Sequence, residues 1–247
     1  MTIRAAGRLV WLAFEVTAAL FDYFFEVALN APKNLRAARA AWMHRVARRH
    51  LKIFGGSVKV FGEIPTSGLL VSNHLSYLDI VVICSVAPTV FVSKAEVRRW
   101  PVFGVLAKLG GTIFIQRERR THVGAVNGEI EKALADGALV VIFPEGTSSN
   151  GATILPFRAP LLEPALRGGC EISIACLQYE LTDGDPPTEV CYWGEHTFFP
   201  HLLNLLGKKS IHATLRFGKF HRAAGDRKEL AQQLHAAVSE LKLPGAK

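Results

Sequence analysis

From about residue 53 onward, short apolar runs rich in β-branched residues alternate with amphipathic stretches, which predicts an α/β domain. The runs expected as strands are 58–61, 69–72, 90–93, 112–116, 139–143, 172–178, 189–193 and 211–217. The expected helices are 79–86, 96–109, 121–136, 157–167 and a last amphipathic helix over 226–242. Strands that are apolar throughout are typical of a sheet covered on both faces. The predicted fold is therefore a mixed, largely parallel central sheet flanked by helices.

The chain begins with a different pattern, because residues 9–29 are apolar and aromatic except for Glu15, Asp22 and Glu26. On a helix these three acids fall within an arc of about 40°. One charge at the centre of a membrane-spanning helix costs ~2.5–3.5 kcal/mol, so three acids argue against a simple span. Two interpretations stay open. The helix lies in, or partly enters, a membrane interface, or it is an amphipathic helix that covers the core.

The next segment, 33–52, is strongly basic and contains no acid. Its cations are Lys33, Arg36, Arg39, Arg45, Arg48, Arg49 and Lys52. Basic residues beside an apolar aromatic segment are typical of contact with anionic lipid head groups. A solvated helix or a nucleic-acid-binding arm are the alternatives. We predict that residues 1–52 form a helical membrane-docking segment and that residues 53–247 form the catalytic domain.

Composition narrows the possible partners. Hydrophobic residues make up 49% of the chain and the mean hydropathy is positive (+0.21), which excludes a disordered protein. The formal net charge is +8, so the surface attracts polyanions, and nucleic acid, anionic lipids and phosphorylated substrates all qualify. The four cysteines form no C-x-x-C pair, which argues against a zinc ribbon or a disulfide scaffold.

The first candidate for chemistry is the segment Asn73-His74-Leu75-Ser76-Tyr77-Leu78-Asp79, directly after the predicted strand 69–72. On a regular helix His74 and Asp79 would lie about 140° apart, so they meet only if a turn separates them. A carboxylate paired with an imidazole fixes its tautomer and suits a general base. The alternative is structural: Ser76 and Asp79 form a capping box, and His74 is an ordinary loop residue.

Two more polar clusters follow predicted strands, at the edge where α/β sheets bind ligands. Arg117 comes directly after strand 112–116, and Lys94 follows strand 90–93. A guanidinium at a strand end can grip a phosphate with two hydrogen bonds. The segment Phe143-Pro144-Glu145-Gly146-Thr147 closes the most apolar strand. Taken singly, each cluster is also compatible with a solvated turn.

Together, the ordered motifs N-H-x-x-x-x-D, G-x-x-F-I-x-R (Gly111 to Arg117) and F-P-E-G-T resemble the glycerolipid acyltransferase family over about residues 55–220. The resemblance implies that His74 is the base and that Asp79 orients it. It also implies that Arg117, Glu145 and Gly146 serve the acyl acceptor. The full set of predicted substrate-binding residues is Asn73, Lys94, Arg117, Glu145, Gly146, Thr147 and Arg158.

The family's activity implies transfer of a fatty acyl group from acyl-CoA or acyl carrier protein to the hydroxyl of a lysolipid. The acceptor expected first is 1-acylglycerol-3-phosphate, which would give phosphatidic acid. Lyso-ornithine lipid or another lysophospholipid is the alternative acceptor, because such relatives share the three motifs. The chain departs from the family at Phe157-Arg158-Ala159-Pro160, where F-K-x-G is common, and at 172–175, which lacks a proline.

Other functions are weighed against this one. An acyl-thioester hydrolase and a non-enzymatic basic lipid- or nucleic-acid-binding module remain open, although the chain lacks the G-x-S-x-G signature of nucleophile-elbow hydrolases. No metal, cofactor or nucleic acid is expected. The expected location is an anionic membrane surface, at the cytoplasmic face of a bacterial inner membrane.

Overall fold

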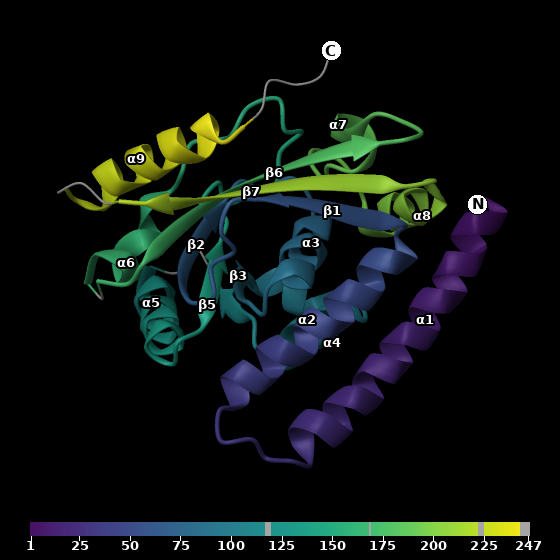
Figure 1. Cartoon of the computed structure of the whole chain (residues 1–247), viewed down its shortest axis with the longest axis horizontal. Helices are drawn as coiled ribbons and strands as arrows, with labels where there is room; N and C mark the ends of the chain where they lie inside the picture. Colours follow the sequence, from purple (N-terminus) through teal and green to yellow (C-terminus); the bar gives the residue numbers. More distant parts are fainter. Residues whose placement is uncertain (117–119, 168, 222–224, 243–247) are drawn as a thin grey trace.

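The computed structural model describes residues 1–116, 120–167, 169–221 and 225–242, and it has a single mixed sheet at its centre (Figure 1). In the described residues the sheet has seven strands in the order β1-β7-β6-β2-β5-β3-β4. All neighbours are parallel except β6 and β7. The strands are β1 (Gly56–Phe61), β2 (Gly68–Ser72), β3 (Val90–Lys94), β4 (Ile113–Ile115), β5 (Leu139–Ile142), β6 (Ile172–Leu181) and β7 (Ile211–Phe220). The predicted mixed, largely parallel sheet is confirmed.

Helices cover both faces of this sheet and enclose two separate parts of the core. One part lies under α1 (Ile3–Tyr23), α2 (Leu35–Ile53), α3 (Leu78–Val86) and α8 (Phe198–Gly207). The other lies under α5 (Arg120–Ala135), α6 (Glu163–Arg167) and α9 (Arg227–Glu240). The remaining elements are η1 (Phe24–Ala28), η2 (Ala95–Arg99), α4 (Phe103–Leu109), η3 (Ala159–Leu162) and α7 (Pro186–Glu189). Every residue of β2 and β5 is buried, and this burial on both faces explains their apolar runs Leu69–Val71 and Leu139–Ile142.

The structure departs from several of the predicted elements. The expected strand 189–193 does not form, because the chain there ends the short helix α7; Val190 and Cys191 are buried by packing rather than by strand pairing. The expected helix 96–109 is split into η2 and α4 at Pro101. A proline disfavours the helical conformation of the residue before it, and Trp100 is indeed extended (ψ 129°). Helix α8 was not predicted.

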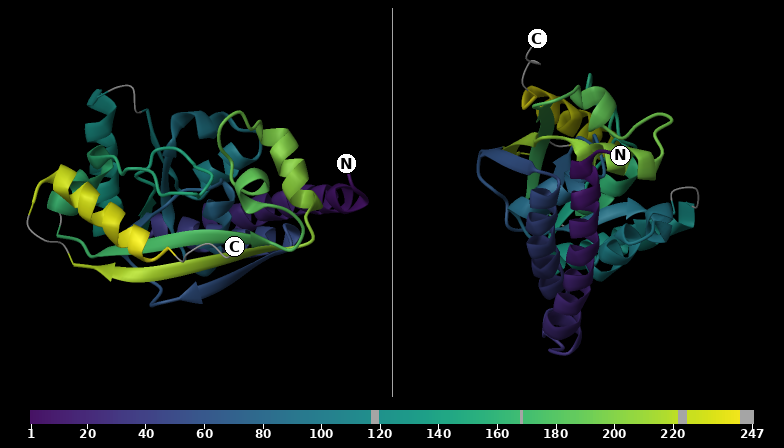
Figure 2. Two further views of the ribbon diagram at one scale, coloured as in Figure 1. Left: turned by 90° about the horizontal axis from the view of Figure 1, so that it is seen from above. Right: turned by 90° about the vertical axis from the view of Figure 1, so that its right-hand side faces the viewer.

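The N-terminal segment is an antiparallel pair of helices, with α1 on the outside (Figure 2). The three acids of this segment, two on α1 and one on η1, face α2: Glu15 and Asp22 both pair with Arg49, and Glu26 pairs with Arg45. Arg45 and Arg49 of the basic run are therefore paired with acids of the same N-terminal segment. In the described part of the chain, no helix combines the length and hydropathy needed to cross a bilayer.

The same pair of helices also belongs to the core. Ala5 and Leu12 of α1 are buried in the main apolar cluster, and α2 contributes Ala47 and Ile53 to it. Trp42 of α2 is fully buried and donates a hydrogen bond to the Ala19 carbonyl (3.0 Å). The division of the chain at residue 52 stays a prediction, but the two sides of it share one packed interior.

Candidate active site

The polar clusters meet at one edge of the sheet because β2, β5 and β3 are adjacent and parallel, so their carboxyl ends lie side by side. His74 follows β2, Lys94 ends β3, and the turn 143–147 follows β5. A cavity of about 240 Å³ opens there; its lining includes His74, Lys94, Gly146 and Thr147. The predicted convergence of these segments is confirmed.

His74 and Asp79 are paired. The Nδ1 atom of His74 lies 2.8 Å from Oδ2 of Asp79. A short loop separates them, and Asp79 occupies the first turn of α3, which is the geometry that their spacing requires. The His74 ring is partly exposed and lines the cavity, whereas the Asp79 side chain is completely buried. With Nδ1 facing the carboxylate, Nε2 is the ring nitrogen left for a proton from a ligand.

Asp79 is held by three further donors. The backbone N–H groups of Leu75 and Ser76 donate to its Oδ2 at 2.7 and 3.0 Å, and the hydroxyl of Tyr179 on β6 donates to its Oδ1 at 2.8 Å. Burial and the nearby carboxylate raise the pKa of Tyr179 well above its usual value, so its phenol remains a donor. The predicted capping box forms only in half: Asp79 accepts the Ser76 N–H, but the Ser76 hydroxyl has no hydrogen-bond partner among the described residues, and Tyr77 is the N-cap of α3. The same carboxylate orders the loop and contacts the imidazole.

Glu145 ties the turn after β5 to the His74 loop. Its Oε1 accepts the backbone N–H of His74 (2.7 Å) and its Oε2 accepts that of Leu155 (2.9 Å). The side chain is 2% exposed, and burial raises the pKa of its carboxyl. Gly146 closes the turn with φ +77°, a conformation that favours glycine. Glu145 does not line the cavity in the described part of the chain, so the contacts it makes here are positioning ones, and its contact with the acceptor stays a prediction.

Asn73 has a similar role. Its amide nitrogen donates to the Leu177 carbonyl (2.9 Å) and its amide oxygen accepts the Leu177 N–H (2.7 Å), which fastens the start of the loop to β6. The residue is buried. Asn73 was predicted to bind substrate; its geometry instead fixes the backbone that carries His74.

Aromatic side chains form much of the cavity wall, and the sequence analysis missed them. The His74 ring stacks on Phe143, with ring centroids 4.2 Å apart and planes 13° apart. The other aromatic lining residues are Tyr77, Phe91, Trp100, Tyr192 and Trp193. Together with Phe143 they come from five separate segments, so no local pattern in the sequence predicts that they share one wall.

The remaining predicted site residues are more exposed. Lys94 and Thr147 are exposed at the cavity. Arg158 is exposed, and its backbone N–H donates to the Pro144 carbonyl (2.9 Å); it does not belong to the cavity lining in the described part of the chain. Arg117 lies outside the described residues.

Comparison with known proteins agrees with this geometry. A family model described as Acyltransferase matches residues 58–178. The lyso-ornithine lipid O-acyltransferase of Brucella abortus is 32% identical over 93% of this chain and 90% of its own length. The 1-acyl-sn-glycerol-3-phosphate acyltransferase of Neisseria gonorrhoeae is 36% identical over 47% of this chain and 46% of its own length.

The fold is also shared with a solved structure. The 1-acyl-sn-glycerophosphate (LPA) acyltransferase of Thermotoga maritima superposes with a TM-score of 0.61 and 15% identity, over 96% of this chain and 95% of that one. Sequence similarity over nearly the whole length and an agreeing fold lead to one conclusion. The chain belongs to the glycerolipid acyltransferase family, and it is an acyltransferase.

Proposed function

We propose that this protein transfers a fatty acyl group from a thioester to the free hydroxyl of a lysolipid, with His74 as the general base. The observation that carries this proposal is the His74–Asp79 pair, held at 2.8 Å with the imidazole on a cavity. General-base catalysis of this kind contributes ~10²–10⁴ to the rate.

The chemistry needs no covalent enzyme intermediate. Nε2 of His74 takes the proton of the lysolipid hydroxyl while its oxygen attacks the thioester carbonyl. The tetrahedral intermediate then collapses, the carbon–sulfur bond breaks, and the imidazolium returns its proton to the leaving thiolate. Asp79 stabilises the positive charge that the ring carries between the two steps. The products are the acylated lipid and a free thiol.

Two acceptors are candidates. Lyso-ornithine lipid is favoured, because the relative named for it is similar over 93% of this chain, against 47% for the Neisseria relative named for 1-acyl-sn-glycerol-3-phosphate. The latter acceptor stays the second candidate because the three motifs belong to both kinds of enzyme. Arg117, by its resemblance to the family's motif, would contact the acceptor's anionic group. The proposed donor is acyl-CoA or acyl carrier protein.

We further propose that the protein works on an anionic membrane surface, at the cytoplasmic face of the inner membrane. Exposed apolar side chains follow α1 and η1 on the outside of the molecule. They include Ile3 (95% exposed), Val10 (72%), Phe14 (71%), Phe21 (60%) and Phe25 (57%). A continuous exposed apolar stripe on a helix is typical of docking at a lipid interface.

The test is acyl transfer by the purified full chain in detergent micelles. Labelled acyl-CoA is supplied with lyso-ornithine lipid, with 1-acylglycerol-3-phosphate, or with neither, and the lipid products are separated. We expect acylated lipid only where a lysolipid is present, with the higher kcat/KM for lyso-ornithine lipid. His74→Ala is expected to lower the rate by about 10²–10⁴. His212→Ala removes an exposed histidine on β7 and is the matched control.

Two results would contradict the proposal in different ways. Free fatty acid formed at the same rate with or without a lysolipid would make the protein a thioester hydrolase. Full transfer activity in His74→Ala would remove the imidazole from the mechanism while leaving the acyl-transfer reaction intact.

A further inference from the structure

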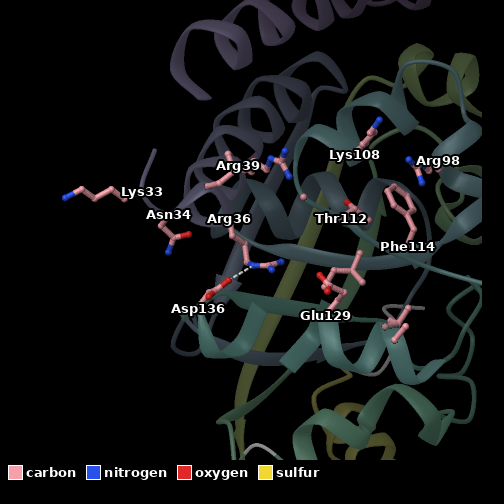
Figure 3. A pocket seen from close by; sticks show the side chains of 15 residues that line it. Lys33, Asn34, Arg36, Arg39, Arg98, Lys108, Thr112, Phe114, Glu129 and Asp136 are labelled. Atoms are coloured by element: carbon pink, nitrogen blue, oxygen red, sulfur yellow. Dashed lines mark hydrogen bonds and ion pairs between the residues drawn. The ribbon is translucent and has the colours of Figure 1, made fainter. Parts of the chain in front are cut away.

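A second and larger hollow runs along the outer strand β4, between the first turn of α2, the end of α4 and the inner face of α5 (Figure 3). Its volume is about 760 Å³, which is in the range of small-molecule sites. We call it the β4 groove. The cations that line it are Lys33, Arg36, Arg39, Arg98 and Lys108.

The acids of the β4 groove are already neutralised. Asp136 pairs with Arg36, with Oδ2 2.9 Å from Nε, as Figure 3 shows. Glu129 pairs with Lys132 on the next turn of α5, at 2.9 Å. The carboxylates therefore cancel one groove cation and one cation outside the groove.

Most of the positive charge remains available. Within the described residues, the side chains of Lys33, Arg98 and Lys108 have no hydrogen bond or ion pair with the protein. Arg39 contacts only a neutral group, since its Nε donates to the Tyr23 hydroxyl at 3.2 Å. Like charges gathered in a concave surface create a potential that attracts anions. Arginine also matches phosphate geometry with paired hydrogen bonds.

The β4 groove and the His74 cavity are separated by one thin wall. Ser93 on β3 lines the cavity, and Phe114 on β4, its partner in the strand register, lines the groove. Neighbouring strands are only about 4.8 Å apart. Two consecutive residues of η2 also line different hollows: Val97 lines the cavity and Arg98 lines the groove. A ligand that occupies both hollows must therefore be long enough to pass around this wall.

Such a ligand must carry its anionic part far from its reacting atom. A lysolipid does not meet this condition, because its head group lies close to the hydroxyl that is acylated. Acyl-CoA does: its thioester and its phosphates stand at opposite ends of the long pantetheine arm. We propose that the β4 groove binds the phosphates of acyl-CoA while the thioester lies beside His74. This inference rests on the proposed function. Acyl carrier protein also has a phosphate at the far end of its pantetheine arm, and CoA is chosen over it because the groove has the volume of a small-molecule site.

The first test is direct binding to the intact chain. The double variant Arg98→Ala/Lys108→Ala removes two exposed groove cations, while Arg99→Ala/Lys228→Ala removes two exposed cations that do not line the groove. Titration calorimetry with CoA and with adenosine 3′,5′-bisphosphate gives the Kd. We expect the groove variant to bind about tenfold more weakly or worse, because each lost contact is charge-assisted. The Kd of the control variant is expected to stay within about twofold of the wild-type value, because salt screens the attraction between CoA and charges that lie far from it.

The second test is kinetic. The ratio of kcat/KM for acyl-CoA to that for acyl-pantetheine, which lacks the phosphates, is expected to fall about tenfold in the groove variant and to hold in the control variant. Equal CoA affinity and an equal ratio in both variants would overturn the proposal. So would a defect confined to acyl carrier protein, or one confined to binding vesicles that contain phosphatidylglycerol.

The failure of this inference is distinguishable from failure of the proposed function. Groove-dependent CoA binding without any acylated lipid would contradict the acyl-transfer mechanism and leave the groove assignment standing. Normal acyl transfer with unaltered CoA binding in the groove variant would contradict only the groove assignment.

Discussion

The His74 edge of the sheet and the outer face of α1 use their side chains in opposite ways. At the His74 edge, Asp79 and Glu145 are almost completely buried, yet every one of their carboxylate oxygens accepts a hydrogen bond. On α1, Phe14 and Phe21 are 71% and 60% exposed. Buried polar groups that are satisfied make a rigid, preorganised site, whereas exposed apolar groups indicate a partner outside the chain.

The polar side chains of α1 strengthen this contrast. Glu15 is nearly buried and pairs with Arg49, which also bonds Asp22 (2.6 Å). The helix thus turns its acids toward α2 and its aromatic rings outward. The His74 edge is complete within the chain, whereas the outer face of α1 leaves large apolar side chains exposed, which is what the proposed docking to a membrane would cover.

The largest expected effect is a loss of kcat caused by a substitution at the His74 edge. Asp79→Asn keeps the shape of the side chain but offers His74 an amide, which can donate to Nδ1 and select the wrong tautomer. We expect kcat to fall by about 10²–10⁴, with a much smaller change in the KM of either substrate. The measurement is steady-state transfer to both lysolipids, with Glu180→Gln, an exposed acid on β6, as the control. A kcat within threefold of the wild type would show that the carboxylate only orders the loop.

The next largest effect is a loss of vesicle binding caused by substitutions on the outer face of α1 and η1. In Phe14→Ser/Phe21→Ser/Phe25→Ser three exposed rings are lost, and burying each ring in a bilayer contributes about 1–2 kcal/mol. We expect binding to vesicles with anionic lipid to weaken by about a hundredfold or more, while the melting temperature and turnover in micelles change little. Phe61→Ser/Ile64→Ser removes exposed apolar residues elsewhere and is the control. Equal losses in both variants would mean that α1 has no special role in docking.

Helix α8 joins the two regions, because it packs on α1 and its His201 contacts Tyr77 in the cavity wall (Nδ1 to the hydroxyl, 2.9 Å). Burial, and then the neighbouring His196, lower the pKa of His201 to about 4. The unfolded histidine titrates near 6.5, so between pH 6.5 and 4 the unfolded chain binds the extra proton. Stability is therefore lost as the pH falls through this window.

We expect His201 to account for about 2–3 kcal/mol of that loss. The measurement is urea unfolding at pH 7 and at pH 4.5, comparing the wild type with His201→Gln, which cannot titrate. The variant should lose less stability between the two pH values, whereas His212→Gln, which alters an exposed histidine, should behave like the wild type. An unaltered pH dependence in His201→Gln would assign the acid sensitivity to other groups.

Sequence patterning predicted the sheet well because burial on both faces leaves a strong signal, as in 139–143. It failed where tertiary packing or a single residue determines the secondary structure. Val190 and Cys191 are apolar because they belong to the core cluster that includes the buried leucines of α8, not because they pair in a sheet. Pro101 breaks a helix that the surrounding apolar pattern continues.

In the candidate site, too, the local contacts could be predicted from the sequence and the distant ones could not. The spacing of His74 and Asp79 predicted their meeting through a turn, because it involves only neighbouring residues. The partners that hold them come from distant strands: Leu177 and Tyr179 on β6 are about 100 residues away. No local pattern indicates such partners, and for that reason the positioning contacts of Asn73 and Glu145 were missed.

The smallest expected effect comes from removing one of the hydrogen bonds that hold Asp79 at the His74 edge. Tyr179→Phe removes only the hydroxyl that donates to Asp79 Oδ1 (2.8 Å) and keeps the buried ring. Losing one donor to a buried carboxylate should cost about 1–2 kcal/mol in the free energy of unfolding and lower kcat by about three- to tenfold. Tyr23→Phe, which loses a hydrogen bond to Arg39 beside the β4 groove, is the matched control for stability. If Tyr179→Phe were destabilised while its kcat stayed at the wild-type value, the Leu75 and Ser76 N–H groups alone would suffice to aim the carboxylate at His74, and Tyr179 would serve folding only.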